Sequence, residues 1–221
     1  MTDAAASRTD LARIVFYVGA AIALSHLANE WVKAPTPFGP AWKCAGIVLL
    51  GVYVLMRGAW LPALGFFFSA VGDVALELPG GMVPGMAAFG LAHVCYAATF
   101  VGYMRREGVM WKAWPLSVVV LAISGELAYW LYPAMAELTV PALAYQVIIS
   151  AMVVLALMSR APMIAKIGAV VFMLSDTLIA VGLFRQVVVP PGSVWITYAA
   201  AQIMLAIGFT KPRSVQGQAA G

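Results

Sequence analysis

The amino-acid sequence predicts an all-α, polytopic membrane protein with eight transmembrane helices and with its N- and C-termini cytoplasmic. Three observations predict this fold class. The 221 residues are 63% hydrophobic and 10% charged, whereas a soluble globular domain carries roughly 25% charged residues. The apolar residues form eight segments of about membrane-spanning length. The basic residues gather mainly in alternate connections between these segments.

Each helix is predicted from an apolar stretch that ends at proline, glycine or charge. A helix of about 20 residues crosses the hydrocarbon core of a bilayer. Breaks are predicted at Pro35-Thr36-Pro37, Pro79-Gly80-Gly81, Pro133, Pro162 and Pro190-Pro191-Gly192. The eight spans are therefore expected at 11–29, 40–56, 60–78, 84–104, 113–132, 140–159, 164–184 and 193–210.

The spans are expected to form one transmembrane domain, 11–210, between a polar N-terminal tail, 1–10, and a polar C-terminal tail, 211–221. The connections are short, and none has the composition of a linker to a second domain. No small-residue cleavage site follows the first apolar stretch, so we interpret it as a retained span rather than a signal peptide.

The distribution of Lys and Arg predicts the orientation, because cytoplasmic loops favour these residues. With the N-terminus inside, ten of the thirteen basic residues lie on the cytoplasmic side and three lie outside. The outer three are Lys33, Lys43 and Arg185. We therefore expect an integral, multi-pass protein of a bacterial inner membrane. Tryptophans near span ends predict an interfacial belt: Trp31, Trp42, Trp60, Trp111, Trp114 and Trp195.

Other classes of protein and site fit the sequence poorly. The net charge of +4 comes from scattered loop residues, without the basic stripe that nucleic-acid binding requires. Cys44 and Cys95 lie in apolar segments and are typical of buried hydrophobic residues, not of a disulfide framework. Two distant histidines provide no pattern of metal ligands. We expect no metal and no organic cofactor.

Two aspartates are the strongest functional candidates, because a carboxylate within a membrane costs several kcal/mol unless it is paired or hydrated. With a helical rise of 1.5 Å per residue, Asp73 lies roughly 8 Å and Asp176 roughly 12 Å below the outer ends of their spans. Other polar residues share the outer half of the bundle and predict a polar pocket that opens there: His26, Asn29, Lys43, Glu77, His93, Tyr96, Glu126, Tyr145, Gln146 and, near mid-span, Gln202.

A structural role is the alternative for several of these residues. Gln202, Tyr145 and Ser69 are equally compatible with hydrogen bonds that only join helices. Glu77, Glu126, His26 and Lys43 lie close enough to the membrane surface to extend toward water. Gly46, Gly51 and Gly65 indicate close helix packing.

Four motifs, in order, resemble those of the YhhN/TMEM86 family of membrane proteins. They are the Gly-Asp of residues 68–76, the Phe-Gly-Leu-Ala-His-x-x-Tyr of 89–96, the Tyr-Gln opening of 145–152 and the Ser-Asp of 168–176. Lys43 stands where the family typically has Lys-Pro, and Cys44 replaces the proline. The resemblance covers residues 40 to 210 and agrees with the number of spans.

The resemblance implies a lysoplasmalogenase, an enzyme that hydrolyses the vinyl ether bond of a lysoplasmalogen, or of a related lysolipid, to a fatty aldehyde and a glycerophospho-amine. The partner is then a lysophospholipid in the bilayer; its head group, its chain length and the oligomeric state stay open. A vinyl ether is cleaved by acid through an oxocarbenium ion. Two carboxyls that ionise at different pH would supply the acid and the base, as in glycosidases.

We therefore expect Asp73 and Asp176 to be the catalytic pair, with Asp73 favoured weakly as the acid because Glu77 is one turn away. The expected substrate-binding residues are Lys43, Glu77, His93, Tyr96, Glu126, Tyr145, Gln146 and Gln202. Among them Lys43 would meet the phosphate, and His93, Tyr96 and Gln146 would orient water or polar oxygens. The chain of the lipid is expected in the apolar inner halves of the helices.

Two other functions remain open from the sequence. Intramembrane carboxylates also serve small transporters and proton-coupled carriers, although no broken helices and no strong internal repeat are visible. The second is a non-catalytic lipid-binding or scaffolding protein.

Overall fold

The structure is a computed structural model that describes residues 3–35 and 37–211, and it is built of helices joined by short connections. Eight helices of the described residues are long: α1 (Asp3–Ser25), α3 (Phe38–Met56), α4 (Trp60–Leu76), α5 (Met82–Glu107), α6 (Trp114–Leu131), α7 (Thr139–Met158), α8 (Met163–Arg185) and α9 (Ser193–Thr210). The shorter elements are α2 (Asn29–Val32) and the 3₁₀ turns His26–Ala28, Trp111–Ala113, Tyr132–Ala134 and Ala136–Leu138.

The eight predicted spans correspond to the eight long helices, so the polytopic all-α prediction is confirmed. Seven of the described helical spans are long and apolar enough to cross a membrane, and α4, with 17 residues, is shorter. Most helix ends fall at the predicted proline and glycine breaks; Pro162, for example, immediately precedes α8. Exposed large apolar side chains, such as Ile14, Ile123 and Val147, occur along the helices, as expected of a surface that faces lipid.

Most of the predicted polar N-terminal tail is helical. Helix α1 begins at Asp3 and so includes most of the segment 1–10. Residues 212–221 of the C-terminal tail lie outside the described part of the chain.

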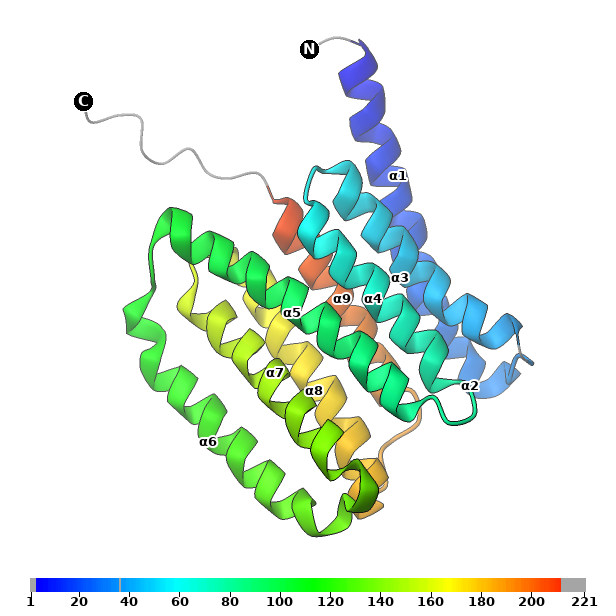
Figure 1. Cartoon of the computed structure of the whole chain (residues 1–221). Coiled ribbons are helices and arrows are strands. Elements are labelled where there is room, and N and C mark those ends of the chain that lie inside the picture. The colour runs from blue at the N-terminus through cyan, green and yellow to red at the C-terminus, as the bar shows by residue number, and fades with distance from the viewer. Residues whose placement is uncertain (1–2, 36, 212–221) are drawn as a thin grey trace.

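Six of the helices form a closed ring around the core (Figure 1). Going around it, α3 packs on α4, α4 on α5, α5 on α7, α7 on α8, α8 on α9, and α9 returns to α3. Helix α1 lies outside the ring against α3 and α9, and α6 lies at its edge, mainly against α7. The start of α1 and the end of α9 lie at the same end of the bundle (Figure 1), as an even number of crossings requires.

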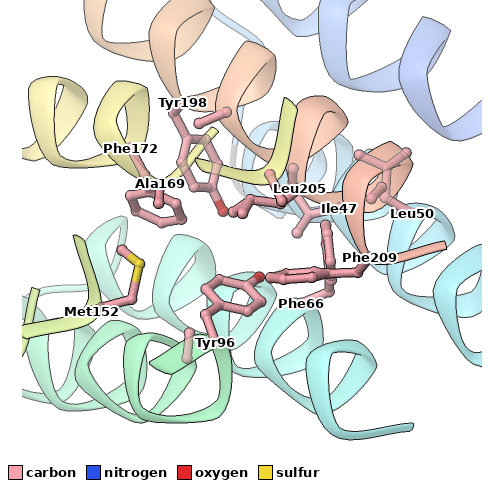
Figure 2. Packing of buried hydrophobic residues seen from close by; sticks show 14 of the residues in the cluster. Ile47, Leu50, Phe66, Tyr96, Met152, Ala169, Phe172, Tyr198, Leu205 and Phe209 are labelled. Carbon is pink, nitrogen blue, oxygen red and sulfur yellow. The ribbon is translucent and has the colours of Figure 1, made fainter. Parts of the chain in front are cut away.

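Aromatic side chains fill the centre of the ring (Figure 2). Phe172 of α8 makes edge contacts with Tyr198 of α9 and with Phe89 of α5. Small residues let the helices approach this closely. A Cβ on Gly46 would lie 2.5 Å from the backbone of Ala23, and one on Gly65 would lie 2.5 Å from the ring of Tyr96. The prediction of close packing at the glycines is confirmed there.

Candidate active site

A polar cavity of about 370 Å³ opens at the end of the bundle opposite to the start of α1 and the end of α9. We refer to it as the acidic pocket. Its walls are the N-terminal halves of α3, α5 and α9, the last turn of α4, the second half of α8, the α8–α9 connection and the short segment after α1. The polar and charged side chains that line it are His26, Asn29, Lys43, Asp73, Glu77, Ser175, Asp176 and Tyr198.

Asp73 lies in the last turn of α4 and is 2% exposed. The hydroxyl of Tyr198, from α9, donates a hydrogen bond of 2.7 Å to Asp73 Oδ2. The preceding glycine positions this carboxyl, because a Cβ on Gly72 would come within 2.6 Å of the ring of Phe89. Phe89 in turn makes an edge contact with the ring of Tyr198. The Gly-Asp pair therefore lets α4, α5 and α9 converge on one carboxyl.

Asp176 is held by a different pair of residues. Tyr145 of α7 donates a hydrogen bond of 2.5 Å to Asp176 Oδ2. His93 Nε2 of α5 lies 2.9 Å from the Tyr145 hydroxyl and 3.4 Å from the same carboxylate oxygen. Because Tyr145 gives its single proton to Asp176, a hydrogen bond between His93 and Tyr145 requires the His93 proton on Nε2. His93 is fully buried, and the Asp176 side chain is 15% exposed.

The two carboxyls thus line one cavity but have separate partners. Helix α4 ends at Leu76, so Asp73 is about 4.5 Å from its helix end, while Asp176 is about 14 Å from the end of α8. Asp73 is closer to its helix end than the predicted 8 Å because α4 ends two residues earlier than expected, and Asp176 is slightly deeper than the predicted 12 Å because α8 ends one residue later. Both side chains still reach the same cavity, since α8 extends beyond α4 at this end.

An ion pair lies at the mouth of the acidic pocket. Lys43 Nζ donates to Glu77 Oε1 at 2.8 Å, and the two side chains are 17% and 43% exposed. The Lys43 ammonium also lies 5.8 Å from the centre of the Trp195 ring, within the range of a cation–π contact. Trp195 is 7% exposed and donates to Ala23 O, so it forms part of the pocket wall rather than the predicted interfacial belt. Trp31 and Trp60, in contrast, are 80% and 65% exposed.

A second, apolar pocket of about 90 Å³ adjoins the first. It lies between α5, α6, α7 and α8, and most of its lining is aliphatic or aromatic: Leu76, Met82, Met86, Phe89, Leu131, Met135, Ala142, Ile179, Ala180, Leu183 and Phe184. Asp176, Leu76, Phe89 and Ile179 belong to both pockets. The apolar pocket is therefore at the same end of the bundle as the acidic pocket, not in the inner halves of the helices where the lipid chain was expected.

The structure separates some residues that the sequence grouped together. Lys43, Glu77, Asp73 and Asp176 line the acidic pocket, and Tyr145 and Gln146 line the apolar pocket. Tyr96 and Gln202 line neither pocket.

Tyr96 and Gln202 belong to the core. Both side chains are fully buried, and the Tyr96 hydroxyl donates to Gln202 Oε1 at 3.1 Å, joining α5 to α9. For Gln202 this geometry is that of the structural alternative, a hydrogen bond between helices. Glu126 is exposed on α6 and lines neither pocket, because the orientation of that helix turns the side chain away.

Tyr198 is the main site residue that the sequence did not suggest. It lies four residues before Gln202, on the same face of α9, and this spacing was the available signal. Within the part of the chain that the structure describes, no three His, Cys, Asp or Glu side chains form a group that could hold a metal.

The comparisons with known proteins agree with this architecture. The model of the YhhN family matches residues 38–209. Proteins named lysoplasmalogenase from Mycobacterium bovis and Mycobacterium tuberculosis are each 34% identical over 197 residues, which cover 82% of this chain and 74% of theirs. The human protein named lysoplasmalogenase TMEM86B is 34% identical over 179 residues, 76% of this chain and 75% of its own. No solved structure matches the chain at a significant level. The chain belongs to the YhhN family of integral membrane proteins.

Proposed function

We propose that this protein hydrolyses the vinyl ether bond of a lysoplasmalogen and that Asp73 and Asp176 carry out the acid–base chemistry. The observation that carries the proposal is the position of Asp176, which lines both the acidic pocket and the apolar pocket. The vinyl ether of a lysoplasmalogen lies at the corresponding junction in the substrate, between a polar glycerophospho group and a hydrocarbon chain. The names of the mycobacterial and human relatives support the same activity.

In this proposal the two pockets bind different parts of the substrate. The phosphate would meet Lys43 at the mouth of the acidic pocket, where the ammonium has one carboxylate partner, Glu77. The first carbons of the alkenyl chain would enter the apolar pocket beside Met86 and Ala142. The rest of the chain would lie in the bilayer, because the apolar pocket adjoins α6 at the edge of the bundle.

The reaction begins with carbon protonation. A carboxylic acid gives its proton to the β-carbon of the vinyl ether, and the oxygen-bearing carbon becomes part of an oxocarbenium ion. A carboxylate stabilises this cation and then takes a proton from the water that attacks it. The resulting hemiacetal collapses: its hydroxyl returns a proton to the first carboxyl, and the second carboxyl protonates the leaving glycerol oxygen. Both groups regain their starting state, and one water is consumed.

We assign the acid to Asp73 and the carboxylate to Asp176. Asp176 Oδ2 accepts from Tyr145 and faces His93 Nε2, so this carboxyl is held as an acceptor by two neighbours. Among the described residues Asp73 has one donor, Tyr198, on Oδ2, which leaves Oδ1 available to carry the proton. Tyr145, His93 and Tyr198 act as positioning residues that fix the two carboxyls.

The distribution of basic residues indicates on which side of the membrane the acidic pocket opens. Ten of thirteen basic residues lie on the predicted cytoplasmic side, and Lys43, beside the acidic pocket, belongs to the other side. We infer that the acidic pocket opens toward the outer face of a bacterial inner membrane.

Aldehyde release from a lysoplasmalogen by the purified protein in detergent tests the proposal. The variants Asp73→Asn and Asp176→Asn should each retain the fold and lose aldehyde release by a factor of roughly 100 or more, because each removes an acid–base group. Glu126→Gln is the matched control, since it removes an exposed carboxylate outside both pockets, and it should keep wild-type activity. Full turnover by either Asp variant would remove that residue from the mechanism. Absence of aldehyde from the wild-type protein would instead favour a carrier.

Two substrate analogues test the bond that is cleaved. The saturated ether cannot form an oxocarbenium ion by carbon protonation, so it should not react. A lysophospholipid with an ester bond should also resist, because it has no vinyl β-carbon for a carboxyl to protonate. Release of free fatty acid from the ester at a similar rate would contradict vinyl ether specificity.

A further inference from the structure

A second cluster of charge lies at the end of the bundle opposite to the acidic pocket. A cavity of about 450 Å³ is lined by Val109, Met110, Trp111, Lys112 and Arg160. It lies between the α5–α6 connection and the α7–α8 connection. These connections are tied together, because Met110 N donates to Met158 O at 2.7 Å. The cavity therefore has a defined backbone frame.

The charges around this cavity are positive, and they form no ion pair with a carboxylate of the residues that the structure describes. Lys112 and Arg160 line it directly. Behind Met110 lies Lys166, which is 4% exposed and has two weak contacts, at 3.7 Å to Met110 Sδ and at 3.5 Å to Leu157 O. Across residues 3–35 and 37–211, none of these three cations forms an ion pair with a carboxylate.

This group of cations is electrostatically unfavourable unless an anion neutralises it. Arg160 is close enough to Lys166 for the two like charges to repel each other, and a buried cation normally has a paired anion. Glu107, the acidic residue closest in sequence to Lys112, is exposed at the end of α5 and forms no ion pair within the described residues. An anion from outside the chain would neutralise the cluster.

The surroundings indicate that this anion belongs to a lipid. Trp111 lines the cavity and is 70% exposed, and Trp114 is 60% exposed. Exposed tryptophans of this kind gather at the level of lipid head groups. Val109 and Met110 add an apolar wall to the basic one. Basic pockets between transmembrane helices bind the head groups of anionic lipids on the cytoplasmic side.

We propose that the cavity formed by Met110, Trp111, Lys112 and Arg160 binds the phosphate of an anionic phospholipid, with Lys166 supporting the charge from behind. This lipid is a bound component of the fold and is separate from the substrate. The site is independent of the acidic pocket, so its test does not depend on the proposed enzymatic activity.

Native mass spectrometry of the whole protein, released from mixed phosphatidylglycerol and phosphatidylcholine, measures the preference. The wild-type protein should retain phosphatidylglycerol preferentially. Lys112→Gln and Arg160→Gln should each reduce this preference about fivefold, and the double variant roughly 25-fold, because one basic residue near a surface contributes about this factor. The matched control is Arg57→Gln, an exposed cation near the same end that lies outside the cavity. It should change the preference less than twofold.

Thermal unfolding in nanodiscs gives a second readout. Phosphatidylglycerol should raise the unfolding temperature of the wild-type protein above its value in pure phosphatidylcholine. Lys166→Met should raise the temperature in phosphatidylcholine and reduce the gain from phosphatidylglycerol, because it removes the buried charge. Equal retention of the two lipids by the wild-type protein would overturn the proposal. An equal effect of Arg57→Gln, or full replacement of the lipid by inorganic phosphate, would overturn it too.

Discussion

Tyr198→Phe tests the link between the acidic pocket and catalysis at a residue that only the structure identifies. The hydroxyl of Tyr198 is buried and donates at 2.7 Å to Asp73 Oδ2. If Asp73 is the acid, it becomes a carboxylate when it protonates the substrate. The hydrogen bond then strengthens, because a donor binds a charged acceptor more tightly than a neutral one.

The magnitude follows from the kind of bond that is lost. A hydrogen bond to a charged group contributes about 1.5–3 kcal/mol and one to a neutral group about 0.5–1.5 kcal/mol, so the difference of about 1–1.5 kcal/mol corresponds to a factor of about 5 to 13 in rate. Because the bond is stronger in the transition state than in the ground state, kcat should fall by this factor while KM changes little. The phenyl ring keeps the contacts with Phe89 and Phe172, so the fold should be retained.

The assay is initial-rate aldehyde release over a range of lysoplasmalogen concentrations, with the unfolding temperature measured on the same preparation. A kcat within twofold of the wild-type value, in a protein of unchanged unfolding temperature, would refute the role of Tyr198. A rise in KM at constant kcat would show that Tyr198 binds substrate and does not support the acid.

Three further substitutions test the mouth of the acidic pocket, the apolar pocket and the helix contact beside Asp73. Lys43→Gln should raise KM roughly fivefold at constant kcat, and this change should vanish for an alkenylglycerol without phosphate. Ala142→Phe should fill the apolar pocket and raise KM for long alkenyl chains more than for short ones; equal effects on both would argue against chain binding there. Gly72→Ala should destabilise the protein by about 1–3 kcal/mol, seen as a lower unfolding temperature, because its Cβ would lie 2.6 Å from the Phe89 ring. Gly125→Ala is the control, since nothing lies within 4 Å of its Cβ, and an equal loss there would contradict the packing argument.

Hydropathy and helix breakers were sufficient to predict the helices, because the bilayer limits the length of a span and proline limits where it continues. The span predicted at 193–210 coincides with α9. Counting residues from span ends also placed Lys43, Glu77 and Asp73 near one another, and they line one pocket. The depth of a residue within a span can be predicted from sequence, because the rise per residue of a helix is fixed.

Rotation about the helix axis was not predictable in the same way. Glu126 shares the depth of the site residues, yet α6 turns it away from both pockets. Tyr96 also has a suitable depth, but its side chain packs into the centre of the ring beside Phe66. Tyr198 was missed because a tyrosine in an apolar span is common and its partner, Asp73, is 125 residues away. Packing between helices decides which helix faces meet, and these faces cannot be predicted from a single sequence.

The most direct test of the account is solvent labelling of the product. Hydrolysis in D₂O, with the aldehyde trapped immediately as an oxime, should place one deuterium on the carbon next to the carbonyl, because a carboxyl delivers its solvent-derived proton to the β-carbon. Asp73→Asn should yield no labelled aldehyde above the uncatalysed background. Wild-type aldehyde without deuterium on that carbon would contradict carbon protonation, and with it the role proposed for the acidic pocket.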